Sequence, residues 1–197
     1  MGNFDAVYQR SIDDPAEFWA EAAQGIDWSR PWDSVLDDSN PPMYRWFPGG
    51  ELNTCHNALD RHADGGRGEQ TALIYDSPVT ATVRKYSYSE LRDLTAKFAG
   101  VLAQNGVGKG DRVIVYMPMV PELAFAMLAC ARIGAVHSVI FAGFSAESIA
   151  DRNNDANAKV QLTADGAYRR GKVLELKTIV DEALEKSPTV ETCIVLA

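Results

Sequence analysis

The sequence predicts an α/β fold, a mostly parallel sheet flanked by helices, preceded by an extended arm rich in aromatic residues. From about residue 70, short runs of β-branched residues alternate with segments of helical periodicity, an order that builds right-handed βαβ units. The run at 111–118, DRVIVYMP, is almost continuously apolar, as in strands buried on both faces of a parallel sheet. All four tryptophans, by contrast, lie before residue 47.

Residues 1–66 form the predicted arm. Asp14, Pro15 and Glu17 have the order of an N-cap, a first helical position and a capping-box partner, and they predict a helix start. The following segment, 26–50, is rich in proline, glycine, aspartate and serine and spaces its aromatics irregularly. We therefore expect no independent core there, and expect these aromatic side chains to lie in grooves of a larger body.

A second, partial domain is predicted over residues 67–197, after a short helix at 54–62 and the glycine-rich stretch GGRGE. It opens with a hairpin, and Ser87 and Glu90 then provide a capping box for a helix that stops in NGVGKG. Pro121 begins the next helix and Gly134 ends it. The remaining predicted elements are a strand at 136–141, a polar helix at 145–156, a strand at 159–164, an amphipathic helix at 173–187 and a strand at 191–197.

Composition excludes several classes of protein. With a formal net charge of −8 and no long basic run, the chain is not expected to bind nucleic acid or an anionic membrane. No apolar run approaches the ~18 residues of a membrane span, and no signal segment opens the sequence. The three cysteines form no CxxC pair and predict free thiols in a reducing compartment. The expected location is the cytoplasm.

The sequence contains no self-contained catalytic apparatus. His56, His62 and His137 lack metal-ligand spacing, and no nucleophile elbow or catalytic dyad is present, so neither a catalytic residue nor a metal site is predicted. NGVGKGD at 105–111 is similar to part of a phosphate-binding loop. Its order is helix, loop, strand, which is the reverse of what phosphate binding needs, and it is interpreted as the C-terminal turn of a helix.

Two segments are candidates for binding an anion. Gly143 follows a predicted strand, and Ser145 can cap the next helix, which would leave backbone amides free at the carboxyl end of the sheet. Arg169, Arg170 and Lys172 follow the next strand within four residues, and Gly171 allows close approach of the backbone. The alternatives are a tight βα turn at the first segment and a solvated surface turn at the second.

Several of these segments together resemble the N-terminal portion of the short-chain acyl-CoA synthetases, AMP-forming ligases of the adenylate-forming superfamily. The resemblance is carried by LDDSNPPMYRWF, LNTCHNALDRH, TADGAYRRGK and the long segment 111–145, which ends in FAGFS. The opening, YQRSIDDPAEFWAEAAQGIDWSRPW, looks closer to propionyl-CoA synthetase than to acetyl-CoA synthetase. The resemblance covers nearly all of the chain.

The resemblance implies an enzyme that activates a short-chain carboxylate with Mg-ATP to acyl-AMP and transfers the acyl group to CoA. Propionate is favoured and acetate is possible. It implies a CoA-binding site at Gly143 and in the basic turn, with Arg169 and Lys172 contacting the phosphorylated nucleotide end and Arg170 and Gly171 completing the turn. Two departures are Lys172, where acetyl enzymes carry arginine, and Ala142, where the family's usual motif has glycine.

The phosphate loop, acyl pocket and catalytic lysine that the family uses would all follow residue 197. Because the sequence stops inside an apolar strand, we expect a piece of a longer enzyme whose C-terminal portion is its natural partner, and expect the piece alone to be inactive. Three alternatives stay open. They are a stand-alone nucleotide- or CoA-binding regulatory module, a Rossmann oxidoreductase, which the absence of GxGxxG disfavours, and an interaction scaffold built on the tryptophan arm.

Overall fold

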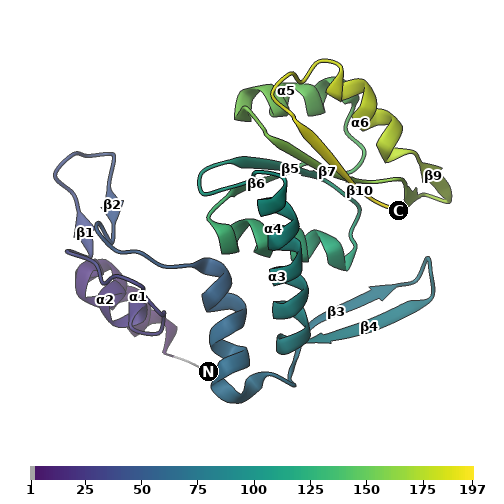
Figure 1. Ribbon diagram of the computed structural model, residues 1–197. Coiled ribbons are helices and arrows are strands. Elements are labelled where there is room, and N and C mark those ends of the chain that lie inside the picture. Colours follow the sequence, from purple (N-terminus) through teal and green to yellow (C-terminus); the bar gives the residue numbers. More distant parts are fainter. Residues whose placement is uncertain (1–2) are drawn as a thin grey trace. The chain divides into compact units, whose positions relative to one another are not determined.

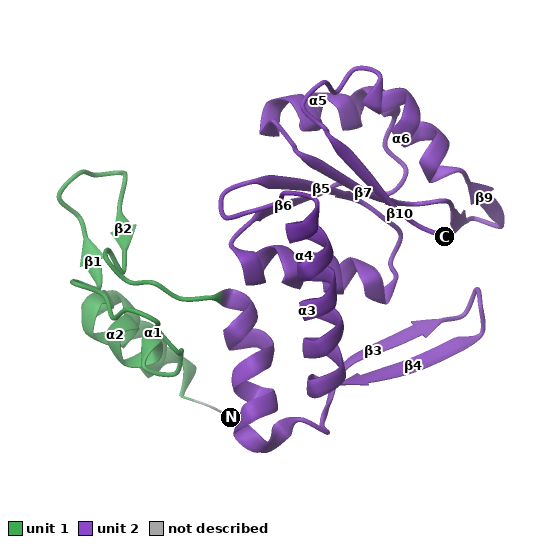
Figure 2. Ribbon diagram, in the orientation of Figure 1, with its two compact units in different colours: residues 1–53 green, residues 54–197 purple. Residues whose placement is uncertain are grey.

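The computed structural model describes residues 3–197 (Figure 1). The chain divides into two compact units, residues 1–53 and 54–197 (Figure 2). Unit 1 contains helices α1 (Phe4–Asp13) and α2 (Pro15–Ala23) and the short paired strands β1 (Leu36–Asp37) and β2 (Arg45–Trp46). All the elements of the predicted second domain lie in unit 2.

Unit 1 confirms one predicted helix start and contains a helix and an aromatic cluster that the sequence did not predict. The Asp14 side chain accepts a hydrogen bond from the Glu17 amide at 2.9 Å, as an N-cap should, whereas helix α1 was not predicted. The tryptophan-rich segment forms a small aromatic cluster of its own, in which the ring centroid of Trp28 lies 4.9 Å from that of Trp32 and 5.4 Å from that of Phe47. The sequence did not predict this cluster, because the three aromatic residues are irregularly spaced and only turns of the chain bring their rings together.

Unit 2 begins with two π-helical turns, η1 (His56–Asp60) and η2 (Ala63–Arg67). They lie in and just beyond the helix predicted over 54–62. Cys55 and Leu59 are buried in a cluster with residues of the later helices and strands, including Tyr86 and Phe125. The compact unit therefore begins at Thr54, earlier than residue 67, where the sequence places the start of the second domain.

The predicted hairpin and the capping box after it are both present. Strands β3 (Thr71–Ser77) and β4 (Thr82–Ser87) pair antiparallel. The Glu90 carboxylate accepts a hydrogen bond from the Ser87 amide at 2.8 Å, and the Ser87 hydroxyl accepts one from the Glu90 amide at 3.2 Å. These two bonds satisfy amides that would otherwise be unpaired and so fix the start of helix α3 (Tyr88–Gln104).

The central sheet is fully parallel, which confirms the predicted fold class. Its strand order is β10-β7-β5-β6, with β5 spanning Arg112–Tyr116, β6 Val136–Val139, β7 Val160–Ala164 and β10 Thr192–Leu196. Helices α4 (Pro121–Ile133), α5 (Ala146–Ala156) and α6 (Leu176–Leu184) connect and cover the strands (Figure 1). Within residues 3–197 no helix combines the length and apolar character that crossing a membrane requires.

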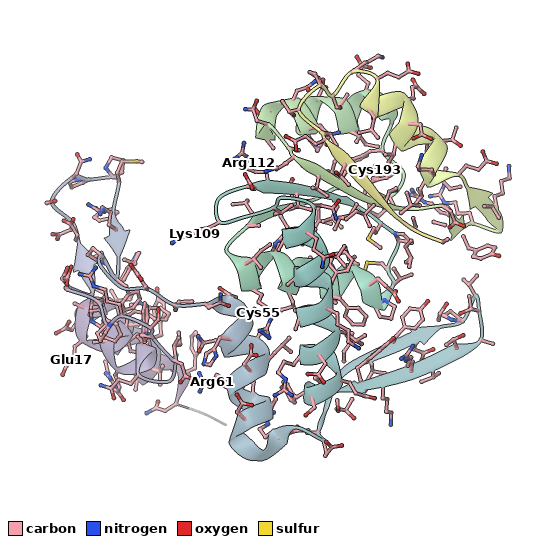
Figure 3. All side chains as sticks on the ribbon, in the orientation of Figure 1. Glu17, Cys55, Arg61, Lys109, Arg112 and Cys193 are labelled. Atoms are coloured by element: carbon pink, nitrogen blue, oxygen red, sulfur yellow. The ribbon has the colours of Figure 1, made fainter. Side chains whose placement is uncertain are left out.

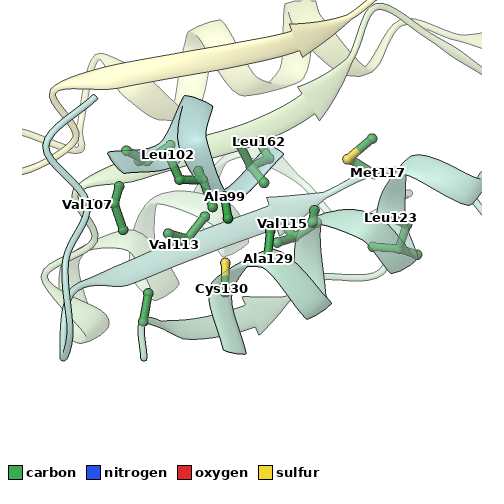
Figure 4. Packing of buried hydrophobic residues seen from close by; sticks show 13 residues of the cluster. Ala99, Leu102, Val107, Val113, Val115, Met117, Leu123, Ala129, Cys130 and Leu162 are labelled. Carbon is green, nitrogen blue, oxygen red and sulfur yellow. The ribbon is translucent and has the colours of Figure 1, made fainter. Parts of the chain in front are cut away.

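Successive side chains of β5 point to opposite faces of the sheet, so the strand contributes to two hydrophobic cores, one on each face. Val113 and Val115 pack with residues of α3 and α4, among them Leu102 and Cys130 (Figure 4). Ile114 and Tyr116 point the other way and pack against α5 and α6. A strand covered on both faces in this way has no polar face, which explains the almost unbroken apolar run in the sequence.

The structure corrects the helix predicted over 173–187, which begins only at Leu176. The preceding residues form a small hairpin of strands β8 (Ala167–Arg169) and β9 (Lys172–Leu174). Arg170 and Gly171 form its turn with φ of 50° and 74°, the left-handed pair that two-residue hairpin turns require. Ladder hydrogen bonds to β8 thus outweigh the helical periodicity that begins at Val173.

The sheet has a topological switch point between β5 and β7, where the strand order reverses. The loop after β5 leads into α4 on one face, and the segment after β7 leads through the β8–β9 hairpin into α6 on the opposite face. Because the two loops diverge at the carboxyl ends of adjacent strands, they leave a crevice there, the usual ligand position in open α/β sheets. The segment FAGFS leaves β6, the neighbour of β5 on its other side, at the same carboxyl edge, and its residues Phe141 and Ala142 line the cavity there.

Candidate functional site

The loop after β6 is fixed at its far end by a helix cap. Ser145 is the N-cap of α5, and its hydroxyl accepts a hydrogen bond from the Ser148 amide at 3.3 Å. This confirms the predicted cap. The loop residues Phe141, Ala142, Gly143 and Phe144 thus lie between an edge strand and a capped helix, at the carboxyl edge of the sheet.

Tyr116, the last residue of the central strand β5, is hydrogen-bonded to the backbone of this loop. Its hydroxyl accepts a hydrogen bond from the Gly143 amide and donates one to the Phe144 carbonyl, each at 3.0 Å. Burial raises the pKa of the Tyr116 hydroxyl, so this side chain stays neutral and able to donate at physiological pH. The Gly143 amide was expected to be free for a ligand, and the structure corrects this, because Tyr116 already occupies it.

Gly143 instead provides space for Arg169. The Arg169 guanidinium donates a hydrogen bond to the Ala142 carbonyl at 3.2 Å and lies 4.8 Å from the centroid of the Phe141 ring. A Cβ atom on Gly143 would lie 1.9 Å from Arg169 Nη1, and the φ of Gly143 is 139°. The structure therefore brings together two of the predicted site residues, which are far apart in sequence.

Arg169 and Lys172 stand directly opposite each other in the β8–β9 hairpin. Cross-strand partners share one face, with Cβ atoms about 4.5–5.5 Å apart, and like charges placed so are destabilising. Across the described residues 3–197, no carboxylate forms an ion pair with Arg169, Arg170 or Lys172, all of which are exposed. Two adjacent cations that lack a carboxylate partner are suited to a multiply charged anion.

A cavity of about 650 Å³ opens beside this pair at the carboxyl edge of the sheet. The tip of the β3–β4 hairpin and the segments that follow β5, β6 and β7 all contribute to its walls. Arg169 lines it next to the exposed apolar side chains of Met119, Phe141 and Tyr168. The cavity thus combines a mostly apolar lining with a few charged side chains, Arg169 among them and Asp76 and Asp165 beside it, which is the usual make-up of a small-molecule pocket.

Sequence reasoning missed Tyr116 and Arg152. Tyr116 lies in the run 111–118, which predicts a buried strand, and a buried tyrosine hydroxyl usually needs a hydrogen-bond partner, a signal that could have singled it out. Arg152 of α5 donates to the Ser148 carbonyl at 2.8 Å and lies 5.1 Å from the centroid of the Phe144 ring. Nothing in the polar sequence of that helix distinguishes this arginine from a solvated one.

The glycine-rich segment at 105–110 lies at the amino end of β5, away from the carboxyl ends of the strands where the candidate site lies. Its order of helix, loop and strand in the sequence predicted this position. Gly106, with φ of 76°, follows the end of α3, and the Gly108 amide donates to the Asp111 carboxylate at 2.8 Å. Lys109 and Arg112 lie in and just after this turn, at the amino end of β5 (Figure 3). Arg112 is engaged with the carbonyls of Ala156 and Asn157. The segment is a helix C-terminal turn.

The described part of the chain contains no group of three or more His, Cys, Asp or Glu residues placed to hold a metal ion. Burial raises the pKa of Cys130 to about 11, which makes this thiol inert as a nucleophile or metal ligand at neutral pH. The exposed pair of Arg169 and Lys172, next to Gly143, is the feature of the described residues that supports recognition of an anionic small molecule.

Replacing Gly143 by alanine is expected to weaken anion binding about tenfold or more. The new methyl group would displace the Arg169 guanidinium, and the left-handed backbone would cost about 1–3 kcal/mol in a residue other than glycine. Gly110→Ala is the matched control, because Gly110 also has a positive φ, lies in the turn before β5 outside the site, and would place its Cβ within 4 Å of no atom. Titration with CoA would measure both variants, and equal affinities would contradict the steric role of Gly143.

Two family models match the chain. Acetyl-coenzyme A synthetase N-terminus matches residues 4–58, and AMP-binding enzyme matches residues 59–197. The chain is 57% identical over 199 residues to acetyl-coenzyme A synthetase of Rhodopirellula baltica, covering 98% of this chain and 30% of that protein. It is 45% identical over 183 residues to the mitochondrial acyl-CoA synthetase short-chain family member 3 of Rattus norvegicus, covering 93% of this chain and 27% of that protein.

A solved structure, acetoacetyl-CoA synthetase from Streptomyces lividans, matches with a TM-score of 0.90 and 32% identity. The match covers 99% of this chain and 30% of that one. The chain thus spans about 30% of the length of these relatives. Because the AMP-binding enzyme model alone matches well over half of the residues, the chain belongs to the AMP-binding enzyme family.

Proposed function

We propose that the protein to which this chain belongs is a short-chain acyl-CoA ligase. The carboxylate oxygen of the acid attacks the α-phosphorus of ATP and releases pyrophosphate, and the CoA thiol then attacks the acyl carbonyl and releases AMP. The names of the relatives, acetyl-coenzyme A synthetase and acyl-CoA synthetase short-chain family member 3, support a short acyl chain. We propose propionate as the favoured acid, with acetate as a possible second, on the resemblance of residues 8–32 to propionyl-type enzymes.

The contribution of this chain is to bind the phosphorylated nucleotide end of CoA. The observation that carries this role is the Arg169–Lys172 pair, two cations facing the same way without a carboxylate partner among the described residues. Arg169 offers a planar fork that can bind a phosphate through two hydrogen bonds, and Lys172 adds a second positive charge. Gly143 leaves the space that the guanidinium needs.

We place the Mg-ATP site and the catalytic lysine in the roughly 70% of the relatives' length that this chain does not span. Among residues 3–197, no group of three or more His, Cys, Asp or Glu side chains is placed to hold Mg²⁺. We expect the chain by itself to lack ligase activity and to bind CoA weakly, because a site shared with other segments loses preorganisation without them.

We propose a cytoplasmic location, which fractionation of source cells would test.

The test is an assay of the full-length protein with ATP, CoA and either propionate or acetate, following AMP and acyl-CoA. We expect AMP formation that depends on both acid and CoA, with a higher kcat/KM for propionate. A higher kcat/KM for acetate would contradict the acyl preference alone. No acyl-CoA from any short acid, combined with retained CoA binding, would favour a CoA-binding regulatory module over a ligase.

A further inference from the structure

A buried tyrosine hydroxyl connects the central strand of the sheet to the loop that carries Gly143. We propose that Tyr116 is a positioning residue for the CoA site: its hydroxyl holds the loop from Phe141 to Phe144 in the shape on which the Arg169 guanidinium rests. This role goes beyond the residues that the resemblance assigns to CoA, and it rests on the proposed function. Tyr116 is not expected to touch CoA, since its side chain is fully buried.

The Tyr116 hydroxyl makes two hydrogen bonds to the loop. It accepts from the Gly143 amide and donates to the Phe144 carbonyl, each at 3.0 Å, across more than 25 positions of sequence. Among the described residues, no other side chain forms a hydrogen bond with either of these two loop groups. The position of Tyr116 is itself fixed, because β5 pairs with β6 on one side and β7 on the other and is covered by helices on both faces. The loop is thereby attached to a strand that is paired on both sides and covered on both faces.

Arg169 depends on this same loop for its orientation. Its two observed contacts are the hydrogen bond to the Ala142 carbonyl at 3.2 Å and the Phe141 ring at 4.8 Å, and both groups lie directly before Gly143. Arg169 itself is exposed, and its partner across the short hairpin is Lys172, a like charge that cannot hold the guanidinium in place. Without the loop as a support, a long arginine side chain would lose its single orientation and with it part of its affinity for phosphate.

Two roles for the hydroxyl can be separated by experiment. If it serves only to satisfy buried polar groups, its removal lowers stability and leaves ligand recognition unchanged. If it positions Arg169, its removal also lowers the preference for CoA over 3′-dephospho-CoA, because that preference depends on where the guanidinium lies. The ratio of the two dissociation constants therefore distinguishes the roles, whereas a melting temperature does not.

The experiment compares Tyr116→Phe with Tyr86→Phe, a control that removes a hydroxyl from another buried tyrosine, in the cluster of Cys55 and Phe125. Calorimetric titrations of the full-length protein that contains this chain, with CoA and with 3′-dephospho-CoA, give both dissociation constants for each variant, for the unaltered chain and for Arg169→Ala. We expect Tyr116→Phe to weaken CoA binding about three- to tenfold and to lower the preference for CoA, with Tyr86→Phe unchanged. Amide exchange at Gly143 should accelerate by a similar or larger factor in Tyr116→Phe alone.

Each outcome decides a different point. If the unaltered chain prefers CoA and Tyr116→Phe keeps that preference in full, or weakens both ligands equally, the positioning role is wrong and the proposed function stands. If the unaltered chain shows no preference, or if Arg169→Ala does not reduce it, the proposed CoA site is wrong and the positioning role falls with it. If Tyr116→Phe does not fold, exchange at Gly143 in the unaltered chain decides, since an unprotected amide would overturn the hydrogen bond to Tyr116.

Discussion

Replacing Arg169 by alanine is expected to weaken CoA binding about 10- to 100-fold. Hydrogen bonds to a charged partner contribute about 1.5–3 kcal/mol each, and about 1.4 kcal/mol corresponds to a factor of ten. The guanidinium is already oriented by the Ala142 carbonyl and the Phe141 ring, so little conformational entropy is lost when it binds a phosphate. The measurement is an NMR or calorimetric titration with CoA and with 3′-dephospho-CoA, and the loss should be largest for CoA.

Two further variants sharpen this test. Lys172→Ala should weaken CoA binding less than Arg169→Ala, since an ammonium group binds phosphate as a point charge, and Lys172→Arg should strengthen it. Arg84→Ala is the matched control, because Arg84 is another arginine on an aromatic ring, 4.5 Å from the centroid of Tyr86, and is not part of the cavity lining. An equal loss in Arg84→Ala and Arg169→Ala would mean that general charge, and not this site, governs binding.

Replacing Ile114 by alanine is expected to lower the free energy of unfolding of unit 2 by about 2–5 kcal/mol. Ile114 lies in the central strand, fully buried against α5 and α6, so the missing methylene groups leave a cavity that the surrounding helices cannot fill. Because whole domains are stable by only about 5–15 kcal/mol, this single change should lower the unfolding midpoint in urea markedly. Circular dichroism during urea unfolding would measure it.

The control for Ile114 is Val136→Ala, on the edge strand β6 of the same sheet. Val136 is 52% exposed, so its truncation removes little buried surface and should change the unfolding free energy by less than about 1 kcal/mol. Equal destabilisation by the two substitutions would contradict the placement of β5 at the centre of the sheet and of β6 at its edge.

Periodicity along the sequence predicted most of unit 2, because each of its regular signals has a local physical cause. DRVIVYMP is apolar at successive positions since β5 is covered on both faces, and the Ser87–Glu90 spacing marks a capping box because one helical turn brings those two residues together. Where two local preferences compete, the sequence misleads. The periodicity from Val173 predicted a helix, yet Lys172–Leu174 pair with β8, since the left-handed turn at Arg170 and Gly171 closes a hairpin.

The candidate site, like the fold, was predictable from the sequence only in part. The sequence alone picked out Gly143, Arg169, Arg170, Gly171 and Lys172, since a glycine after a strand and a cluster of basic residues are visible as residue types. It also determined the parallel α/β fold and the family to which the chain belongs. Only the tertiary structure decided which atoms meet: that the Gly143 amide is bound by Tyr116 and that the missing side chain of Gly143 makes room for Arg169. Contacts between residues more than 25 positions apart depend on the order of strands in the sheet, and that order is set by how β5, β6 and β7 pack together and not by any local pattern.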